Sequence, residues 1–167
     1  MKLPRRIGVK ILVLMGRAVD IWSTSPYPAN VLSNLYPNAF EIDGIRCASM
    51  EGFLQSLKIE DPELQKEICT LSGKEAKERS TSDWQATQII YWQGKHILRQ
   101  SPEFQALLRK AYQCLFEQNE TFRTALLSTK GNRLYHTRGL SNPRKTILTE
   151  QEFCTMLNEL IPILKKR

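Results

Sequence analysis

The sequence predicts a helix-rich α+β domain with a small antiparallel sheet near its N-terminus. Short apolar stretches and a hairpin signal lie within the first fifty residues, capping patterns and helical periodicity follow, and there is no internal repeat or linker. A length of 167 residues suits one core. We therefore expect a single domain over residues 18–164, with a basic extension or first strand at 1–17 and a basic tail at 165–167.

The strand and hairpin signals come first along the chain. Short strands are expected at residues 7–15, 19–22, 40–42 and 45–47. Asp43-Gly44 is a strong signal for a two-residue hairpin turn, which needs positive φ angles. Residues 23–38 are rich in Ser, Pro and Asn, so we expect a loop there. The antiparallel sheet is therefore expected around the hairpin at 40–47.

Capping patterns and apolar periodicity predict helices over the rest of the chain. Helices are expected at residues 50–61, 63–71, 74–79, 85–99, 102–117, 120–128 and 150–164, with a polar loop at 131–145. Residues 82–85 and 149–152 have the pattern of capping boxes, which open the fourth and the last of these helices. Apolar residues recur at helical spacing from Phe104 to Leu115, which predicts a face buried in the core.

The net charge of +7 is concentrated at the two ends of the chain. Residues 1–17 contain five basic residues and residues 165–167 contain three, which leaves 16 basic against 17 acidic residues in between. Basic ends are able to contact the phosphates of a nucleic acid, or they are simply solvated termini. The near-neutral body favours the second interpretation and leaves a weak nucleic-acid contact open.

The four cysteines are scattered along the chain at positions 47, 69, 114 and 154 and form no C-x-x-C pair. A zinc site needs clustered ligands, and His96 and His136 are the only histidines. We expect free, mostly buried thiols, and neither a metal nor a cofactor.

The first residues resemble a signal peptide only superficially. The apolar stretch at 11–15 is short, Lys10 precedes it, and no convincing cleavage site follows. No apolar run approaches the roughly 20 residues that a membrane helix needs. We expect a cytoplasmic protein without a membrane partner, and the sequence leaves open whether Met1 or Met15 is the start.

A polar stripe lies along the helix expected from residue 50, which Ser49 is placed to cap. Glu51, Gln55 and Lys58 recur at i, i+4 and i+7, so they share one side of the helix next to its apolar face. The Glu51 and Lys58 side chains could therefore contact a ligand between them, with Gln55 in the middle. The same spacing also occurs on ordinary solvated helix faces.

Other candidates carry weaker signals. Trp84, Tyr91 and Trp92 could stack a base, although aromatic residues on a helix are more often part of the core. His136, in a polar loop, could carry a proton. Residues 130–133 offer two cations to an anion but lack the glycine spacing of a phosphate loop.

Several short motifs follow one another in a recognisable order. They read DIWSTSPYP at 20–28, LSNLYP at 32–37, FEIDG at 40–44, SMEGFLQSLK at 49–58, EAK at 75–77 and LFEQNETFRTALLST at 115–129. In this order the motifs resemble the NADAR family of YbiA-like proteins. The resemblance covers most of residues 20–137.

The resemblance implies both a fold and a chemistry. It implies a YbiA-like α+β fold that binds ADP-ribose-like or ribosyl-nucleotide ligands. It implies cleavage of an N-glycosidic bond, in a ribosylated riboflavin-pathway intermediate or in ADP-ribosylated guanine. Carried onto this chain, Glu51 and Lys58 are the expected catalytic pair. The residues expected to bind substrate are Trp22, Asn34, Tyr36, Ser49, Gln55 and His136.

The chain also departs from the family pattern. Gly52 stands where the family has a histidine, and His136 stands where it has a glutamate. The family's Asp-x-x-Trp-Gly segment is not recognisable in 138–150.

The sequence leaves three functions open. The first function is an N-glycosidase acting on a ribosyl or ADP-ribosyl nucleobase compound. The second is a non-catalytic ADP-ribose or nucleotide-binding module that acts as a sensor or inhibitor. The third is a basic nucleic-acid-associated protein.

Overall fold

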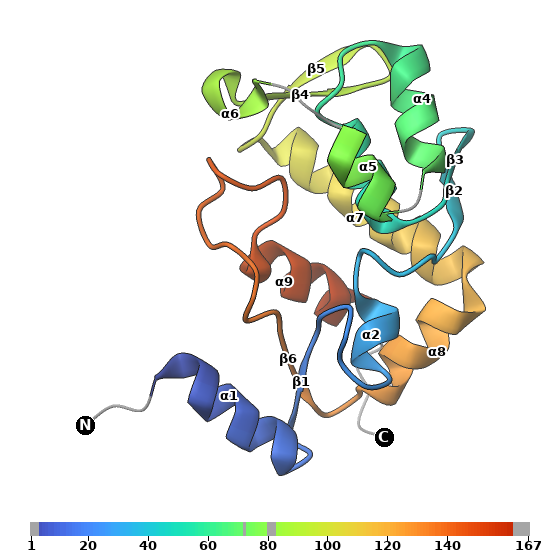
Figure 1. The fold of residues 1–167 in the computed structure, drawn as a ribbon. Coiled ribbons are helices and arrows are strands. Elements are labelled where there is room, and N and C mark those ends of the chain that lie inside the picture. Colours follow the sequence, from blue (N-terminus) through green and yellow to red (C-terminus); the bar gives the residue numbers. More distant parts are fainter. Residues whose placement is uncertain (1–3, 72, 80–82, 162–167) are drawn as a thin grey trace.

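The computed structural model describes residues 4–71, 73–79 and 83–161 (Figure 1). The helices are α1 (Arg5–Leu14), α2 (Ala29–Leu32), α3 (Met50–Ser56), α4 (Pro62–Thr70), α5 (Gly73–Arg79), α6 (Trp84–Thr87), α7 (Pro102–Gln118), α8 (Glu120–Ser128) and α9 (Glu150–Leu160). The strands are β1 (Ala18–Asp20), β2 (Phe40–Ile42), β3 (Ile45–Cys47), β4 (Ile89–Trp92), β5 (Lys95–Leu98) and β6 (Arg133–Tyr135). The helix-rich α+β class expected from the sequence is confirmed.

The strands form three separate pairs. The predicted hairpin, β2 with β3, is present, and its turn residues Asp43 and Gly44 have φ angles of 52° and 77°. A second antiparallel hairpin joins β4 to β5. The third pair is parallel and joins β1 to β6, with Val19 opposite Leu134, so distant parts of the chain meet there.

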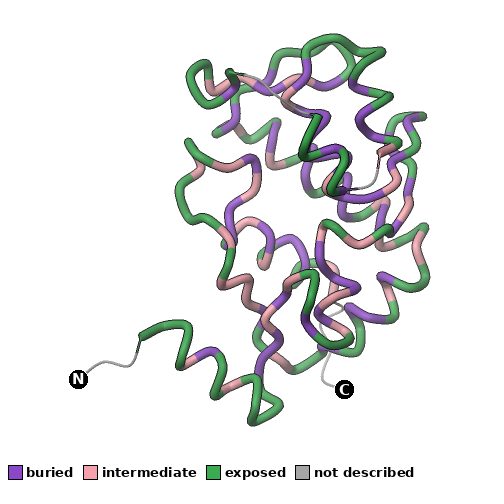
Figure 2. The backbone as a smooth tube through the Cα atoms, in the orientation of Figure 1, coloured by how far each residue is buried: buried purple, intermediate pink, exposed green. Residues whose placement is uncertain are grey.

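The longest helix, α7, runs through the middle of the core (Figures 1 and 2). Its predicted apolar face is buried: Phe104, Leu107, Leu108, Ala111 and Leu115 are each at most 9% exposed. Helices α3, α8 and α9 and the β2 strand pack against it. This core holds α3 and α9, the two helices that matter most for the site described below.

The prediction of a strand at 7–15 is wrong, because these residues form α1. Alternating β-branched residues produced the strand signal, but a strand needs a neighbour with which to pair. The helix satisfies its own backbone and places Val9 on the side that packs against the protein.

The prediction of a helix at 85–99 is also wrong. Helix α6 ends at Gln88, which has a left-handed φ of 57°, and the β4–β5 hairpin follows with Gln93 and Gly94 at its turn. The buried side chain of Gln65 in α4 holds this hairpin: its Nε2 donates to the Tyr91 carbonyl at 2.8 Å, and its Oε1 accepts from the backbone N–H of Gln93 at 3.0 Å. Long-range contacts thus overrode the helical signal.

Smaller differences concern the loops and the helix ends. The segment expected as a loop at 23–38 contains α2, and the loop expected at 131–145 contains β6. The helix from Met50 ends at Ser56, short of residue 61. The capping serine proposed at position 82, the end of the last helix beyond residue 161 and the tail at 165–167 lie outside the described residues.

Candidate functional site

Helix α3 and the turn that follows it carry the predicted polar stripe, and hydrogen bonds join its three side chains. Ser49 caps the helix, since its Oγ accepts from the backbone N–H of Gly52 at 3.0 Å. Gln55 bridges the other two: its Nε2 donates to Glu51 Oε1 at 2.7 Å, and its Oε1 accepts from Lys58 Nζ at 2.5 Å. A carboxylate only accepts and an ammonium only donates, so these partners fix which way the amide points.

Lys58 lies in an environment that favours its neutral form. Burial lowers the pKa of Lys58 below its ordinary value, and nearby Lys77 lowers it further, whereas Glu51 acts in the opposite direction. The net shift is downward. A lysine of this kind has more neutral amine near neutral pH, and the neutral amine is the nucleophile.

Asn34 reaches the same site from the loop after α2. Its Oδ1 accepts from the hydroxyl of Tyr112 on α7 at 2.9 Å, and its backbone carbonyl accepts from the N–H of Glu51 at 2.9 Å. Burial raises the pKa of Tyr112 well above its ordinary value, so the hydroxyl remains a donor. Asn34 is thereby held against the start of α3, with its amide nitrogen as the remaining polar end of the side chain.

His136 comes to the site from the other side, just after β6. Its Nδ1 lies 2.6 Å from the Ile21 carbonyl, which only accepts, so Nδ1 carries the proton and Nε2 of the neutral ring is the acceptor. The backbone N–H of His136 donates to Glu150 Oε1 at 3.1 Å. Gly139 lets the loop fold onto the ring, since a Cβ there would lie 2.5 Å from His136 Cδ2.

These residues line a cavity of about 340 Å³. Its walls also include Leu54, Lys77, Trp84, Gln85, Arg138, Gly139, Leu140, Lys145, Thr146, Ile147, Leu148 and Phe153. Basic side chains reach it from the turn after α3, from α5 and from the loop between β6 and α9, whereas Glu51 is its acidic lining residue. The cavity therefore suits an anionic ligand whose reactive part lies near Glu51 and Lys58.

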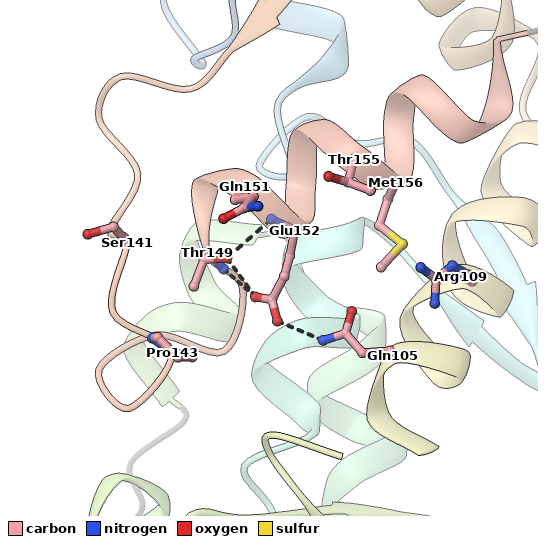
Figure 3. Close-up of a pocket in the computed structure, with 9 residues that line it drawn as sticks. All are labelled: Gln105, Arg109, Ser141, Pro143, Thr149, Gln151, Glu152, Thr155 and Met156. Carbon is pink, nitrogen blue, oxygen red and sulfur yellow. Dashed lines mark hydrogen bonds between the residues drawn. The ribbon is translucent and has the colours of Figure 1, made fainter. Parts of the chain in front are cut away.

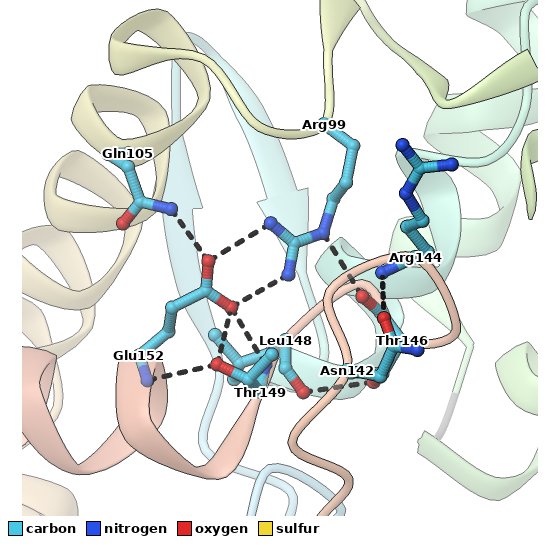
Figure 4. Close-up of polar contacts among 8 residues, drawn as sticks. All are labelled: Arg99, Gln105, Asn142, Arg144, Thr146, Leu148, Thr149 and Glu152. Atoms are coloured by element: carbon cyan, nitrogen blue, oxygen red, sulfur yellow. Dashed lines mark hydrogen bonds and ion pairs between the residues drawn. The ribbon is translucent and has the colours of Figure 1, made fainter.

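A buried ion pair fixes the wall formed by Thr146, Ile147 and Leu148 (Figure 4). The guanidinium of Arg99 is fully buried and donates to both carboxylate oxygens of Glu152 at 3.0 and 2.7 Å, while its Nε donates to the Thr146 carbonyl at 3.0 Å. Burial raises the pKa of Glu152, but Arg99 and Thr149 outweigh it, so the pKa lies below its ordinary value. The carboxylate is thus ionised at neutral pH and ties the loop to the end of β5.

Glu152 also borders a separate cavity of about 310 Å³ (Figure 3). The charged side chains of this cavity are paired: Glu152 with Arg99, and Arg109 with Glu159. Gln105 Nε2 donates to Glu152 Oε1 at 2.7 Å. These contacts are structural, so the cavity around Lys58 is the better candidate for chemistry.

Comparison with known proteins places the chain in a family. Residues 26–161 match the sequence model of the family described as Bacteriophage protein GP30.3. The chain belongs to this family. It is 38% identical over 146 residues to a 17.1 kDa protein from the Gp30–rIII intergenic region of Enterobacteria phage T4, covering 85% of this chain and 95% of that protein.

The fold of this GP30.3 family member is shared with a solved structure. The NMR structure of the Escherichia coli protein YbiA matches it with a TM-score of 0.60 at 20% sequence identity, over 87% of this chain and 83% of that chain. The expected resemblance to YbiA-like proteins is therefore confirmed at the level of the fold.

The structure brings some predicted site residues together and leaves others apart. Asn34, Glu51, Gln55, Lys58 and His136 line one cavity. The remaining three predicted residues do not line it: Ser49 is a buried helix cap, Tyr36 packs against the core, and Trp22 lies in a neighbouring groove.

Of the weaker candidates named in the sequence analysis, some line the cavity and others do not. Trp84 is buried and lines the cavity. Trp92 is buried against the Phe53 ring, and its Nε1 donates to Asp43, while the Tyr91 ring contacts His96. The segment 130–133 does not reach the cavity.

Sequence reasoning missed the basic residues of the cavity. Lys77 was noted only as part of a loosely matching motif, and Arg138 and Lys145 were part of an unremarkable polar loop. Their one signal was the density of cations in residues 138–145. Only the folded chain brings them close to Lys58.

Neither a metal cluster nor a membrane span is found where the chain is described. No group of three His, Cys, Asp or Glu side chains in residues 4–71, 73–79 and 83–161 is placed to hold a metal ion. Within the same ranges, no helix has the length and apolarity to cross a bilayer. All four cysteines are free: Cys47 and Cys69 are buried, and Cys114 and Cys154 are half-buried.

Proposed function

We propose that the protein is an N-glycosidase that cleaves the N–C1′ bond of a phosphorylated ribosyl or ADP-ribosyl nucleobase compound. The observation that carries the proposal is the half-buried Lys58, whose pKa is lowered and which is linked through Gln55 to Glu51 in a cation-lined cavity. The YbiA-like fold supports it as well. The identity of the base stays open.

The chemistry suits an amine beside a carboxyl group. When the ribose ring of an N-riboside opens, C1′ forms an imine with the departing nitrogen. The neutral amine of Lys58 adds to C1′, and the base leaves as a free amine after gaining a proton, for which Glu51 is the nearby carrier. Water then hydrolyses the lysine imine, which releases the sugar as an aldehyde and restores Lys58.

The other residues of the cavity would bind and orient the substrate. Lys77 and Lys145 offer cations to a phosphate on the sugar, and Arg138 adds a third. The protonated Nδ1 of His136 leaves Nε2 to accept from a sugar hydroxyl. Asn34 also lines the cavity and offers its side-chain amide nitrogen as a donor.

Trapping of the lysine imine tests the proposal directly. Ribose 5-phosphate, which carries both an aldehyde and a phosphate, is incubated with the protein and cyanoborohydride, and the modified lysine is located by mass spectrometry. We expect Lys58 to be modified faster than other lysines, and Lys58→Arg to abolish this fast reaction while preserving the melting temperature. Lys66→Arg, on the exposed side of α4, is the matched control and should change nothing.

A release assay then separates the enzyme from a binding module. Ribosylated bases are incubated with protein, and the free base is measured. Release that depends on Lys58 supports the glycosidase. Thermal stabilisation by ribose 5-phosphate or ADP-ribose without trapping or release would overturn catalysis and favour the binding module, which the same cations would serve.

A further inference from the structure

Helix α1 carries an exposed apolar stripe on the side opposite its buried residue Val9. Figure 1 shows α1 standing apart from the body and joined to it near β1, and Figure 2 shows it exposed over most of its length. Ile7, Ile11 and Leu14 follow one another at i, i+4 and i+7 and are 47%, 45% and 87% exposed. Val9 occupies the opposite side and is buried. A stripe of large exposed aliphatic side chains needs a partner.

The same side of α1 is strongly basic. Arg6 and Lys10 are exposed and lie next to the stripe around the helix, and residues 1–17 contain no acidic residue. Asp20 is the acidic residue in the adjoining groove, and both its oxygens already accept hydrogen bonds from Thr137. Arg6, Lys10 and Arg138 outnumber Asp20 among the residues that line this groove, so the surface pairs apolar side chains with an excess of positive charge.

Aromatic residues face α1 across a groove. The groove has a volume of about 710 Å³ and is lined by Ile7, Lys10 and Leu14 on one side and by Trp22 and Tyr27 on the other. Tyr27 is 58% exposed, and the guanidinium of Arg138 stacks on the Trp22 ring at 3.5 Å. Trp and Tyr are the residues that favour the boundary between water and lipid.

We propose that α1 and the Trp22–Tyr27 side of the groove bind the surface of a membrane that contains anionic lipids. The apolar stripe enters the boundary between headgroups and acyl chains, while Arg6 and Lys10 contact lipid phosphates. The helix lies on the membrane and does not cross it. This inference is independent of the proposed glycosidase function, and it revises the sequence-based expectation that the protein has no membrane partner.

The observations favour a lipid surface over two other occupants. A second copy of the chain would bring the Arg6 and Lys10 side chains of both copies together, which opposes association. A nucleic acid would satisfy the cations but leave Ile7, Ile11 and Leu14 in contact with water. Only an anionic membrane matches both parts of the surface.

Vesicle sedimentation tests the proposal. The full chain is mixed with vesicles of phosphatidylcholine, with and without phosphatidylserine, at low and high salt. We expect binding to the vesicles with phosphatidylserine, weakened by salt. The double variant Ile11→Glu/Leu14→Glu should lose binding, and Lys10→Gln should weaken it about fivefold. Leu98→Glu, at a 64% exposed position on β5, is the matched control and should bind as the wild type does.

Tryptophan quenching gives a second measurement that does not depend on the charge-introducing variants. Trp84 and Trp92 are only 4% exposed, so quenching by brominated phospholipids should report Trp22. We expect quenching in the wild type with vesicles that contain phosphatidylserine, and its loss in Trp22→Phe, with melting curves confirming that every variant is folded.

Several results would overturn the proposal. These are an absence of sedimentation with anionic vesicles, binding that survives Ile11→Glu/Leu14→Glu, and equal binding to vesicles without phosphatidylserine. A dimer in analytical ultracentrifugation that the same double variant abolishes would assign the stripe to a second copy. A single-stranded oligonucleotide that displaces the vesicles, and that binds α1 at a lower concentration than they do, would assign this surface to a nucleic acid.

Discussion

Gln55 links Glu51, on α3, to Lys58, in the turn after α3. The two charged residues are seven positions apart, and the amide between them donates to one and accepts from the other. Gln55 is 6% exposed, so little water competes for these bonds. The arrangement keeps the carboxyl group and the amine at opposite ends of one small polar chain without placing them in direct contact. Lys58 therefore stays less basic than it would be in an ion pair.

The first prediction concerns the pH dependence of Lys58. Gln55→Glu places a carboxylate beside the amine and should raise the pKa of Lys58, so less neutral amine is present near neutral pH. The rate of trapping by ribose 5-phosphate should fall about tenfold for each unit by which the pKa rises, and its increase with pH should move to higher pH. Gln55→Leu removes the hydrogen bonds without adding charge and should not move the profile in that direction. An unchanged profile in Gln55→Glu would argue against Lys58 as the nucleophile.

The segment between β5 and α7 and the start of α9 form one unit around a buried ion pair. Arg99 follows β5 directly, and Glu152 lies in the first turn of α9 (Figure 4). Thr146, which accepts from Arg99, belongs to the loop before α9 that lines the cavity. The capping box formed by Thr149 and Glu152 uses the same carboxylate, so the helix start and the loop depend on a single side chain. The end of β5 and the start of α9 therefore fix the position of the cavity wall that this loop forms.

Removing one partner of the pair should be more damaging than removing both. Arg99→Met leaves the Glu152 carboxylate, 17% exposed, without its cation, and we expect a loss of about 3–5 kcal/mol in the free energy of unfolding. The double variant Arg99→Met/Glu152→Met should lose less free energy of unfolding than Arg99→Met, because it leaves no unpaired charge. Urea unfolding near neutral pH measures both variants.

Acid pH and an exposed pair provide the controls for this prediction. The lowered pKa of Glu152 adds stability above the ordinary carboxyl range, and this stability is lost as the pH falls through the native value. The difference between wild type and Arg99→Met should therefore shrink at acid pH. Arg109→Met breaks a pair whose side chains are 51% and 44% exposed, and it should be nearly neutral. Equal effects of Arg99→Met and Arg109→Met would contradict the assigned role of the buried pair.

At the scale of the whole molecule, the β1–β6 pair joins the N-terminal part of the chain to residues 133–135. His136 follows β6, and its ring contacts the Ile21 carbonyl just after β1, so a cavity residue depends on contact with the N-terminal part. Arg5 of α1 donates to Glu150 at 2.6 Å, and the same carboxylate accepts from the backbone of His136. Strand β1 is therefore an integral part of the domain, whereas helix α1 is attached to the outside of the domain.

Two truncations should separate these roles. A chain starting at Gly16 loses α1 and the buried Val9, and we expect it to fold with a loss of about 2 kcal/mol and to lose vesicle binding. A chain starting at Ser23 also loses β1 and the His136 contact, and it should fail to fold cooperatively. Melting curves and two-dimensional NMR spectra check both. Full stability of the shorter chain would show that the β1–β6 pair is dispensable.

Local interactions explain the part of the fold that could be predicted from the sequence. Ser49, Ser101 and Thr149 cap their helices through bonds that span three residues, and Asp43-Gly44 takes up the positive φ angles that its two-residue turn needs. The periodic face of α7 and the spacing of the stripe on α3 likewise follow from helix geometry. The three side chains of the stripe lie together in the structure as that spacing predicted.

The tertiary structure decided what depends on residues far apart in the sequence. Residues 7–15 and 89–98 carried ambiguous apolar patterns, and only their neighbours selected a helix for one and a hairpin for the other. The parallel pairing of β1 with β6 brings residues more than a hundred positions apart together, and no local signal encodes it. For the same reason, Lys77 and Lys145 join Lys58 only in the folded chain. The sequence alone determined the acid–amide–amine stripe, and tertiary packing decided which cations, loops and walls surround it.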